Sequence, residues 1–201
     1  MLMGGATETQ RKLIEVAIKL FATNGFKGTS IRDIARAAGT TISSIYYYFE
    51  SKYGLLLAIL KHLSEGLENE LNRISQAELG PLERFKLLVS THLDQIAAQK
   101  DSAKLFFLDE EELSPAANEI NKQFQIKILH IYKSALRDLA EAGYIDAPKN
   151  LAVSAFNVLG VIQWHLRWYC PEGPLPFEVI KDEAVRFMLF GLLANPSPAD
   201  L

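Results

Sequence analysis

The stretch from Thr29 to Lys52 constrains the fold most, because it encodes two short helices around one glycine. Ser30, with Asp33 three residues later, forms a capping-box pattern, in which a hydroxyl and a carboxylate satisfy backbone N–H groups that the first turn leaves without partners. Gly39 predicts the end of this helix, since glycine enters the left-handed backbone region without steric cost. Thr41 can cap the second helix. The pattern therefore predicts a helix-turn-helix, the motif whose second helix enters the major groove of DNA.

A plain helical hairpin with an aromatic core and no nucleic-acid partner is the alternative interpretation of this stretch. Three consecutive tyrosines, Tyr46 to Tyr48, argue against it. A helix buries side chains along one stripe, so it cannot bury three neighbours in a row. Some of these rings must face solvent or a partner.

The stretch closely resembles the DNA-binding end of the TetR family of bacterial one-component repressors. The residues that carry this resemblance are Thr29–Ala35, Ala38–Gly39, Ile45–Lys52 and Leu55. The rest of the chain resembles the family only in length and helical character. One departure is Gly54, because the family usually has glutamate there. Its absence removes the carboxylate of a capping box, and glycine costs a helix about 1 kcal/mol.

The resemblance implies a set of DNA contacts, position by position. They are Thr29, Ser30, Thr41, Ile42, Ser43, Ser44, Tyr46, Tyr47 and Lys52. Tyr46, Tyr47 and Lys52 correspond to phosphate-binding positions, and phosphate contacts fix register without reading sequence. The four residues 41–44 correspond to positions that face base edges. Ile42 departs from the family, where a long basic or polar residue is common; it can touch a thymine methyl but cannot donate to guanine.

Charge is distributed unevenly along the chain, although the net charge is only −3. Residues 1–52 contain seven Lys or Arg and four Asp or Glu, which leaves fourteen and twenty for the remainder. A cationic end can engage phosphates while an acidic body stays clear of them.

The lone Cys170 excludes an intramolecular disulfide and favours a reducing, cytoplasmic location. No signal peptide or membrane-spanning apolar run is recognisable in the sequence.

Helical periodicity dominates the whole chain, and no window alternates with period two for long enough to predict a strand. We expect an all-α fold of about nine helices. Besides the two short ones, the expected ranges are 8–24, 52–75, 81–99, 102–108, 115–142, 148–168 and 177–193. We divide the chain into a helix-turn-helix DNA-binding domain, residues 1–50, and a helical domain for ligand binding and dimerisation, residues 51–201.

Catalytic and metal-binding patterns are not recognisable in the sequence. The four histidines, His62, His92, His130 and His165, lie far apart, without a cysteine or carboxylate at ligand spacing. There is no Ser/His/Asp or Cys/His set and no glycine loop for a nucleotide phosphate. We therefore predict no catalytic residue, no metal and no cofactor, and a protein that is not an enzyme.

Aromatic residues are abundant in the helical body, and they have two interpretations: core packing or an effector pocket. The predicted ligand-binding residues are Phe106, Phe124, Phe156, Trp164, Arg167 and Trp168. Arg167 favours a pocket, because a guanidinium on an apolar helix needs an internal acid or an anionic ligand group. The segment from Arg167 to Leu175 resembles part of the TetR regulators that respond to acyl-CoA thioesters in lipid or steroid catabolism. That resemblance implies an apolar or acyl-CoA-like effector, such as a fatty acid derivative.

The last two helices have apolar surface for a four-helix dimer interface. The predicted interface residues are Ala152, Ala155, Leu159, Val161, Ile162, Val179, Ile180, Phe187, Leu189 and Phe190. The leading hypothesis is a homodimeric repressor of double-stranded DNA that an effector releases from a palindromic operator. The alternative is a helical ligand-binding or interaction protein without sequence-specific DNA binding. The operator, the effector and the sign of regulation are not encoded in any recognisable motif.

Overall fold

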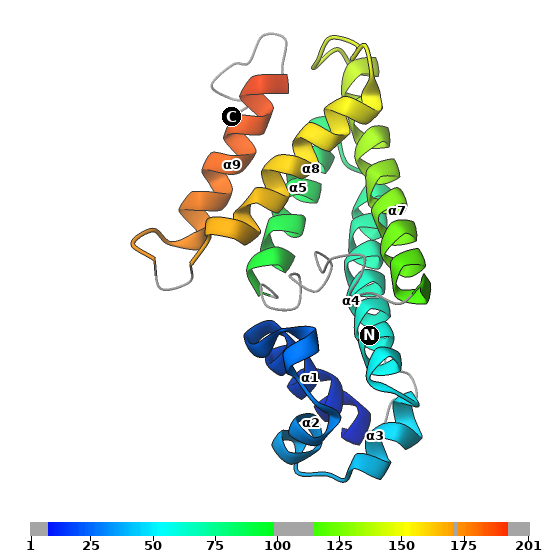
Figure 1. Cartoon of the computed structure of the whole chain (residues 1–201). Helices are drawn as coiled ribbons and strands as arrows, with labels where there is room; N and C mark the ends of the chain where they lie inside the picture. Colours follow the sequence, from blue (N-terminus) through cyan, green and yellow to red (C-terminus); the bar gives the residue numbers. More distant parts are fainter. Residues whose placement is uncertain (1–7, 99–114, 171–172, 193–201) are drawn as a thin grey trace. The chain divides into compact units, whose positions relative to one another are not determined.

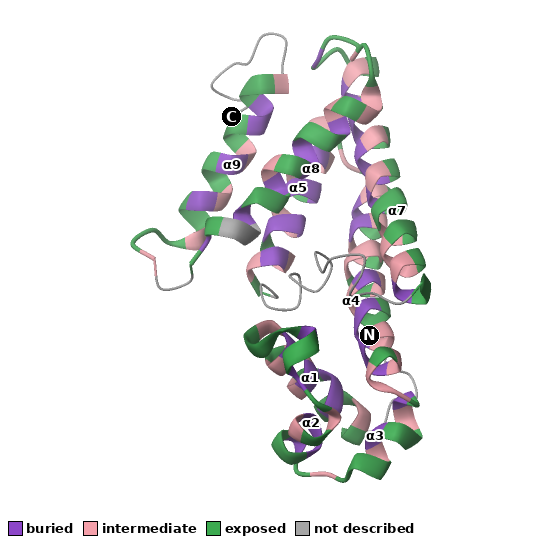
Figure 2. Cartoon of the chain, viewed as in Figure 1, coloured by how far each residue is buried: buried purple, intermediate pink, exposed green. Residues whose placement is uncertain are grey.

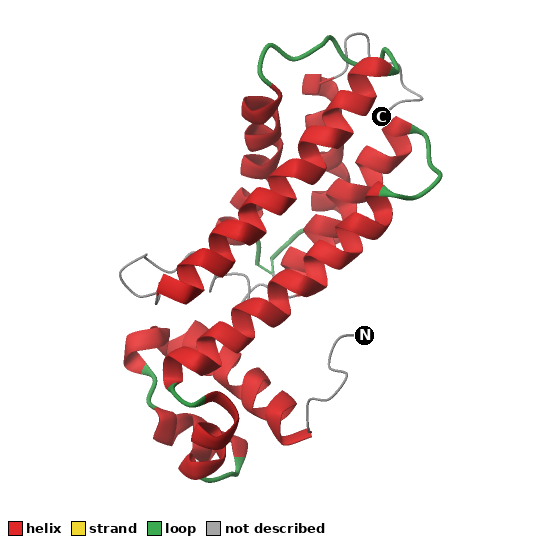
Figure 3. Cartoon of the chain, turned by 90° about the vertical axis from the view of Figure 1, so that its right-hand side faces the viewer, coloured by secondary structure: helices red, strands yellow, loops and turns green. Residues whose placement is uncertain are grey.

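The computed structural model describes residues 8–98, 115–170 and 173–192, and within these ranges the chain is helical, with loops but no strand (Figures 1 and 3). The described helices are α1 (Glu8–Gly28), α2 (Ile31–Ala38), α3 (Ile42–Phe49), α4 (Lys52–Ser75), α5 (Pro81–Ala98), α7 (Pro115–Glu141), α8 (Leu151–Trp168) and α9 (Phe177–Leu192). The predicted all-α fold is confirmed. The helix expected at residues 102–108 lies outside the described residues.

Most helix ends lie within a few residues of the predicted ones, because glycine, proline and capping side chains mark them. Gly25 breaks α1 as expected, with φ 75° and ψ 162°, and a short further turn continues to Gly28. Asn150 begins α8, its side-chain oxygen accepting hydrogen bonds from the N–H groups of Ala152 and Val153. The start predicted at residue 148 is therefore slightly early, since Asn150 satisfies orphan donors that Pro148 cannot.

The chain divides into two compact units, and the first contains residues 8–66 and 115–124. Helices α1, α2, α3 and the first part of α4 surround a core that also receives Ala117 of α7. Its fully buried residues include Leu13, Ile34, Ile45 and Leu56. Within α1 the buried residues Leu13, Ala17 and Phe21 recur at intervals of four, so this helix turns one face to the core (Figure 2).

The second unit contains residues 67–98, 125–170 and 173–192. Here α5 packs against both α8 and α9. Arg84 of α5 donates to Asp138 of α7 at 2.8 Å and to the carbonyl oxygen of Leu79 at 2.8 Å, so it fixes the loop before α5 against α7. A second interhelical ion pair joins Lys181 of α9 to Asp94 of α5 at 2.9 Å.

The boundary between the units falls inside α4, between residues 66 and 67, and α4 itself is continuous from Lys52 to Ser75. The boundary predicted between residues 50 and 51 falls at the turn before α4. Helix α7 crosses the boundary as well, between residues 124 and 125, so α4 and α7 each contribute to both units. The division after residue 50 stays a prediction.

Candidate nucleic-acid interface

Helix α2 begins with the predicted capping box. The Ser30 hydroxyl oxygen accepts from the N–H of Asp33 at 3.2 Å, and the Asp33 carboxylate accepts from the N–H of Ser30 at 3.0 Å. The Ser30 hydroxyl also donates to the Asp33 carboxylate, and this bond, together with the one from the Ser30 N–H, lowers the pKa of Asp33. Gly39 ends the helix in the left-handed region with φ 65°, as the sequence predicts. The cap therefore fixes where the turn between α2 and α3 lies.

Thr29 has a different role from the one implied by the resemblance. Its side chain is 1% exposed, and its hydroxyl lies 2.9 Å from the carbonyl oxygen of Gly25 and 3.1 Å from that of Leu20. Both carbonyls belong to α1, at or before its break at Gly25. Thr29 thus ties that part of α1 to the start of α2, and its hydroxyl is not free to contact a phosphate.

Helix α3 packs on the first unit through Ile45 and Phe49, which are both buried. Its N-cap is Thr41, whose hydroxyl oxygen accepts from the N–H of Ser44 at 3.1 Å and lies 2.9 Å from the Ser44 hydroxyl. The opposite face is exposed: Ser43 is open to solvent, and Tyr47 is 82% exposed. An eight-residue helix whose outer face carries hydroxyl groups suits insertion into a groove of DNA.

Lys52, predicted to bind a phosphate, lies at the start of α4. Its ammonium nitrogen lies 4.3 Å from the centre of the Phe26 ring, within the range of a cation–π contact. Burial lowers the pKa of this lysine. The ring of Tyr53 also packs on Phe26, at 4.9 Å between centroids. The aromatic contact orients the charge, so less rotamer freedom is lost when a phosphate binds.

The turn between α3 and α4 is unusually tight. Glu50 adopts φ 61°, and the N–H of Ser51 lies 2.6 Å from the Phe49 carbonyl oxygen. The Ser51 hydroxyl accepts from the N–H of Gly54 at 2.9 Å, so α4 keeps a side-chain cap although the carboxylate of a capping box is missing. A Cβ on Gly54 would lie 1.9 Å from the Phe49 carbonyl oxygen. Glycine is therefore required here by the close approach of the α3–α4 turn.

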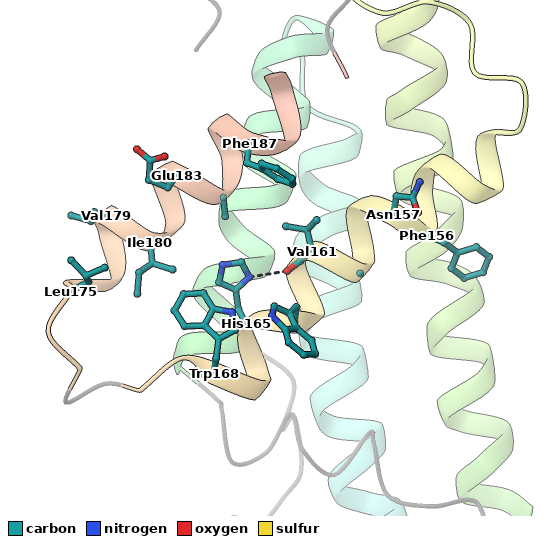
Figure 4. A pocket seen from close by; sticks show the side chains of 13 residues that line it. Phe156, Asn157, Val161, His165, Trp168, Leu175, Val179, Ile180, Glu183 and Phe187 are labelled. Atoms are coloured by element: carbon teal, nitrogen blue, oxygen red, sulfur yellow. Dashed lines mark hydrogen bonds between the residues drawn. The ribbon is translucent and has the colours of Figure 1, made fainter. Parts of the chain in front are cut away.

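Three of the residues predicted to bind an effector lie together in the second unit. Phe156, Trp164 and Trp168 line an open groove of ≈ 860 Å³ between α8 and α9 (Figure 4). Phe124 belongs to the first unit and is half-buried. Phe106 and the Arg167 side chain lie outside the described residues. The ligand-binding set therefore stays a prediction.

The groove has two apolar walls. Phe156, Gly160, Trp164 and Trp168 follow each other at intervals of four along α8, and the facing wall comes from Leu175, Val179 and Phe187. Trp164 is 64% exposed and Phe187 69% exposed, which is unusual for rings of this size. His165 lies at the base, where its Nδ1 is 2.8 Å from the Val161 carbonyl oxygen and its ring packs on Trp168 at 5.1 Å. The interval of four is a sequence signal by which this face could have been found.

The dimer interface predicted from α8 and α9 needs a correction. Five of its residues are buried within the second unit and belong to its core: Ala155, Leu159, Ile162, Ile180 and Leu189. Val179, Phe187 and Phe190 are exposed, as an interface requires. The error arose because both faces of α8 are apolar, so periodicity alone did not distinguish the inner face from the outer one.

Metal and membrane chemistry find no support in the described part of the chain. Among its residues, no group of three or more histidine, cysteine, aspartate or glutamate side chains could hold a metal ion. No described helix is long and apolar enough to cross a membrane.

The folded elements define the class: a helix-turn-helix unit that shares α4 and α7 with a second helical unit. The profile described as "Bacterial regulatory proteins, tetR family" matches residues 13–59, and "Tetracyclin repressor-like, C-terminal domain" matches residues 78–192. The chain therefore belongs to the TetR family of transcriptional regulators and is not an enzyme. The resemblance seen at residues 29–55 is confirmed, and it extends over most of the chain.

Individual relatives match over nearly the full length. The HTH-type transcriptional repressor KstR2 of Rhodococcus jostii (strain RHA1) is 28% identical over 199 residues, which cover 96% of this chain and 94% of that protein. The structure of the ketosteroid transcriptional regulator KstR2 of Mycobacterium tuberculosis superposes with a TM-score of 0.85 at 22% identity, covering 97% and 100% of the two chains. AibR in complex with isovaleryl coenzyme A and operator DNA gives 0.79 at 25% identity, covering 90% and 97%.

Proposed function

We propose that this protein is a cytoplasmic, homodimeric repressor that binds a palindromic operator through α3 and is released from it by an apolar or acyl-CoA-like effector. The observation that carries the proposal is the outer face of α3, where Ser43, Tyr46 and Tyr47 are exposed while Ile45 and Phe49 anchor the helix. The relative of similar length from Rhodococcus jostii is named a repressor, which supports this sign of regulation.

Dimerisation is supported by the groove between α8 and α9. One recognition helix reads only a few base pairs, so helix-turn-helix units work in pairs spaced by about one helical turn of DNA. Phe156, Trp164 and Phe187 expose large apolar rings on one face of the second unit. Exposed apolar patches of this kind mark interaction surfaces. A second copy related by a two-fold axis would place the same face on each side and bury these rings.

An acyl-CoA-like effector is supported by similarity. AibR, which the chain resembles at 25% identity, is described as a complex with isovaleryl coenzyme A and operator DNA. The predicted ligand residues Phe106, Phe124 and Arg167 are candidates for its binding. Phe156, Trp164 and Trp168 have a competing role in self-association, because they lie on the open groove. An effector lowers operator affinity only if it binds better to a conformation that fits DNA poorly.

The test combines two titrations of the full chain. Fluorescence anisotropy with labelled duplexes from its own promoter region should show saturable binding that unrelated duplexes of the same length do not compete away. Isovaleryl coenzyme A and longer acyl-CoAs, added to the complex, should then lower the anisotropy. Absence of any specific duplex would refute the repressor. Specific binding that no acyl-CoA weakens would retain the repressor and remove the acyl effector.

Arg167→Ala separates the effector from the operator. We expect the variant to bind the same duplex with nearly unchanged affinity but to need more acyl-CoA for release, because an anionic group on the ligand would lose its guanidinium partner. Lys52→Met should instead bind the duplex more weakly, with little change in the response to acyl-CoA. If Arg167→Ala instead unfolds the protein, Arg167 is the partner of an internal acid and the ligand contact is refuted.

A further inference from the structure

Ile42 stands at the leading end of α3 as an apolar residue among hydroxyl-bearing neighbours. It is the first helical residue, and its side chain is 37% exposed. Ile45 and Phe49 fill the core beneath it, so Ile42 contributes only part of its surface to packing. The remaining surface faces outward at the end of the helix that carries the base-facing positions.

The two hydroxyl groups nearest to Ile42 in the cap are already engaged. The Thr41 oxygen accepts from the N–H of Ser44, and the two hydroxyls bond each other at 2.9 Å. Releasing the Thr41 hydroxyl for a base would leave the Ser44 N–H without its acceptor, and releasing the Ser44 hydroxyl would break its bond to Thr41. Thr41 and Ser44 therefore act first as the cap of α3. Ile42 and Ser43 are left as the side chains of this turn that can meet base edges.

We infer that Ile42 selects thymine at one position of each half-site, through contact with the thymine 5-methyl group. This inference rests on the proposed insertion of α3 into the major groove. The thymine methyl is the apolar group that a standard base presents there, while guanine, cytosine and adenine present donors and acceptors. An isoleucine placed over those polar edges would exclude water from them without supplying a hydrogen bond. The recognition is thus favourable for thymine and unfavourable for the others.

The magnitude follows from the burial of one methyl group. Removing one buried methyl weakens binding by about fourfold at 25 °C, and removing it from both half-sites of a palindrome weakens it by about fifteenfold. Replacing thymine by a base with an unpaired polar edge costs more, because desolvation is added to the lost contact. A change of fourfold is well within the resolution of an anisotropy titration.

The experiment uses deoxyuridine, which lacks only the 5-methyl group and pairs as thymine does. Duplexes are first selected by the full-length protein from a randomised pool, and each thymine of the selected site is then replaced in turn, symmetrically in both half-sites. Wild-type protein should lose about fifteenfold in affinity at one symmetric pair of positions. For Ile42→Ala, deoxyuridine at that pair should cause no further loss of affinity. Ser43→Ala, the matched control, should remain as sensitive to the replacement as the wild type.

The outcomes are separable. If no deoxyuridine pair weakens wild-type binding, or if Ile42→Ala stays as sensitive as the wild type, the methyl contact is refuted while the operator-binding function stands. If the pool yields no specific duplex, the proposed function fails and this inference fails with it. The deoxyuridine series on wild-type protein needs no variant, so a folding defect in Ile42→Ala does not remove the test.

Discussion

Alanine at Gly54 should destabilise the protein, although alanine is the better helix former. A Cβ at this position would lie 1.9 Å from the Phe49 carbonyl oxygen and 3.1 Å from its carbonyl carbon. Both atoms are backbone, so relief requires movement of the α3–α4 turn, in which Glu50 already adopts φ 61°. Gly66 lies in the same helix, and a Cβ there would meet nothing within 4 Å. The two glycines are therefore a matched pair in opposite surroundings.

At Gly54 the gain in helix propensity and the steric clash have opposite effects on stability, whereas at Gly66 only the gain applies. Alanine gains about 1 kcal/mol over glycine inside a helix. Overpacking costs about 1–3 kcal/mol, and a clash with backbone belongs at the upper end of that range. We expect Gly54→Ala to lose about 1–2 kcal/mol and Gly66→Ala to gain up to about 1 kcal/mol. At about 2–4 °C per kcal/mol for a chain of this size, the two variants should differ by roughly 2–12 °C in Tm.

Thermal unfolding followed by circular dichroism, at equal protein concentration, measures the difference directly. Operator affinity adds an independent signal, because a displaced turn shifts α3 relative to α4 within the first unit. Gly54→Ala should bind DNA more weakly even where it is folded, and Gly66→Ala should bind as the wild type does. An equal gain in Tm for both variants would refute the steric reasoning.

Three further predictions concern charge, pH and self-association. Lys52→Met should weaken binding to all duplexes and lower the slope of log affinity against log salt by about one, because one phosphate contact is lost; Lys52→Arg, which keeps the charge, should retain the slope. Burial lowers the pKa of His92 to about 4, from an ordinary 6.5, so its neutral form stabilises the fold. The free energy of unfolding should therefore be highest above pH 6.5 and fall by up to about 3 kcal/mol as the pH falls to 4. Urea unfolding of His92→Gln should show a smaller fall over the same range. An equal fall would contradict the role of His92. Phe187→Glu should shift sedimentation from dimer to monomer, and the emission of Trp164 and Trp168, the two tryptophans of the chain, should shift to the red with it; a variant that remains a dimer would exclude this face as the interface.

Local signals in the sequence were sufficient to predict α2 and the start of α3. Ser30, Asp33 and Gly39 act within three or four residues of their partners, so their capping roles could be predicted without knowing any tertiary contact. The same holds for Thr41 at the start of α3. Such signals fix both ends of α2 and the start of α3.

Features that depend on the path of the backbone between helices, or on packing between helices, could not be predicted. The sequence explains Gly54 only as a missing glutamate, whereas its reason is the carbonyl of Phe49, which the α3–α4 turn brings close. Thr29 matches a DNA-contacting position, yet its hydroxyl is used by α1 carbonyls nine and four residues away. Helix α8 is apolar on both sides, so only packing against α5 and α9 shows that Leu159 is core and Trp164 is surface.

We propose that two copies of the protein engage one DNA site, each through its α3. Hydroxyl-radical footprinting on a selected duplex, with the protein-to-DNA ratio determined by sedimentation of the complex, tests it most directly. We expect an even number of copies per duplex and two protected tracts, related by a dyad, whose centres lie about 34–36 Å apart along the helix axis. A single protected tract occupied by one copy, or protection without a dyad, would contradict it.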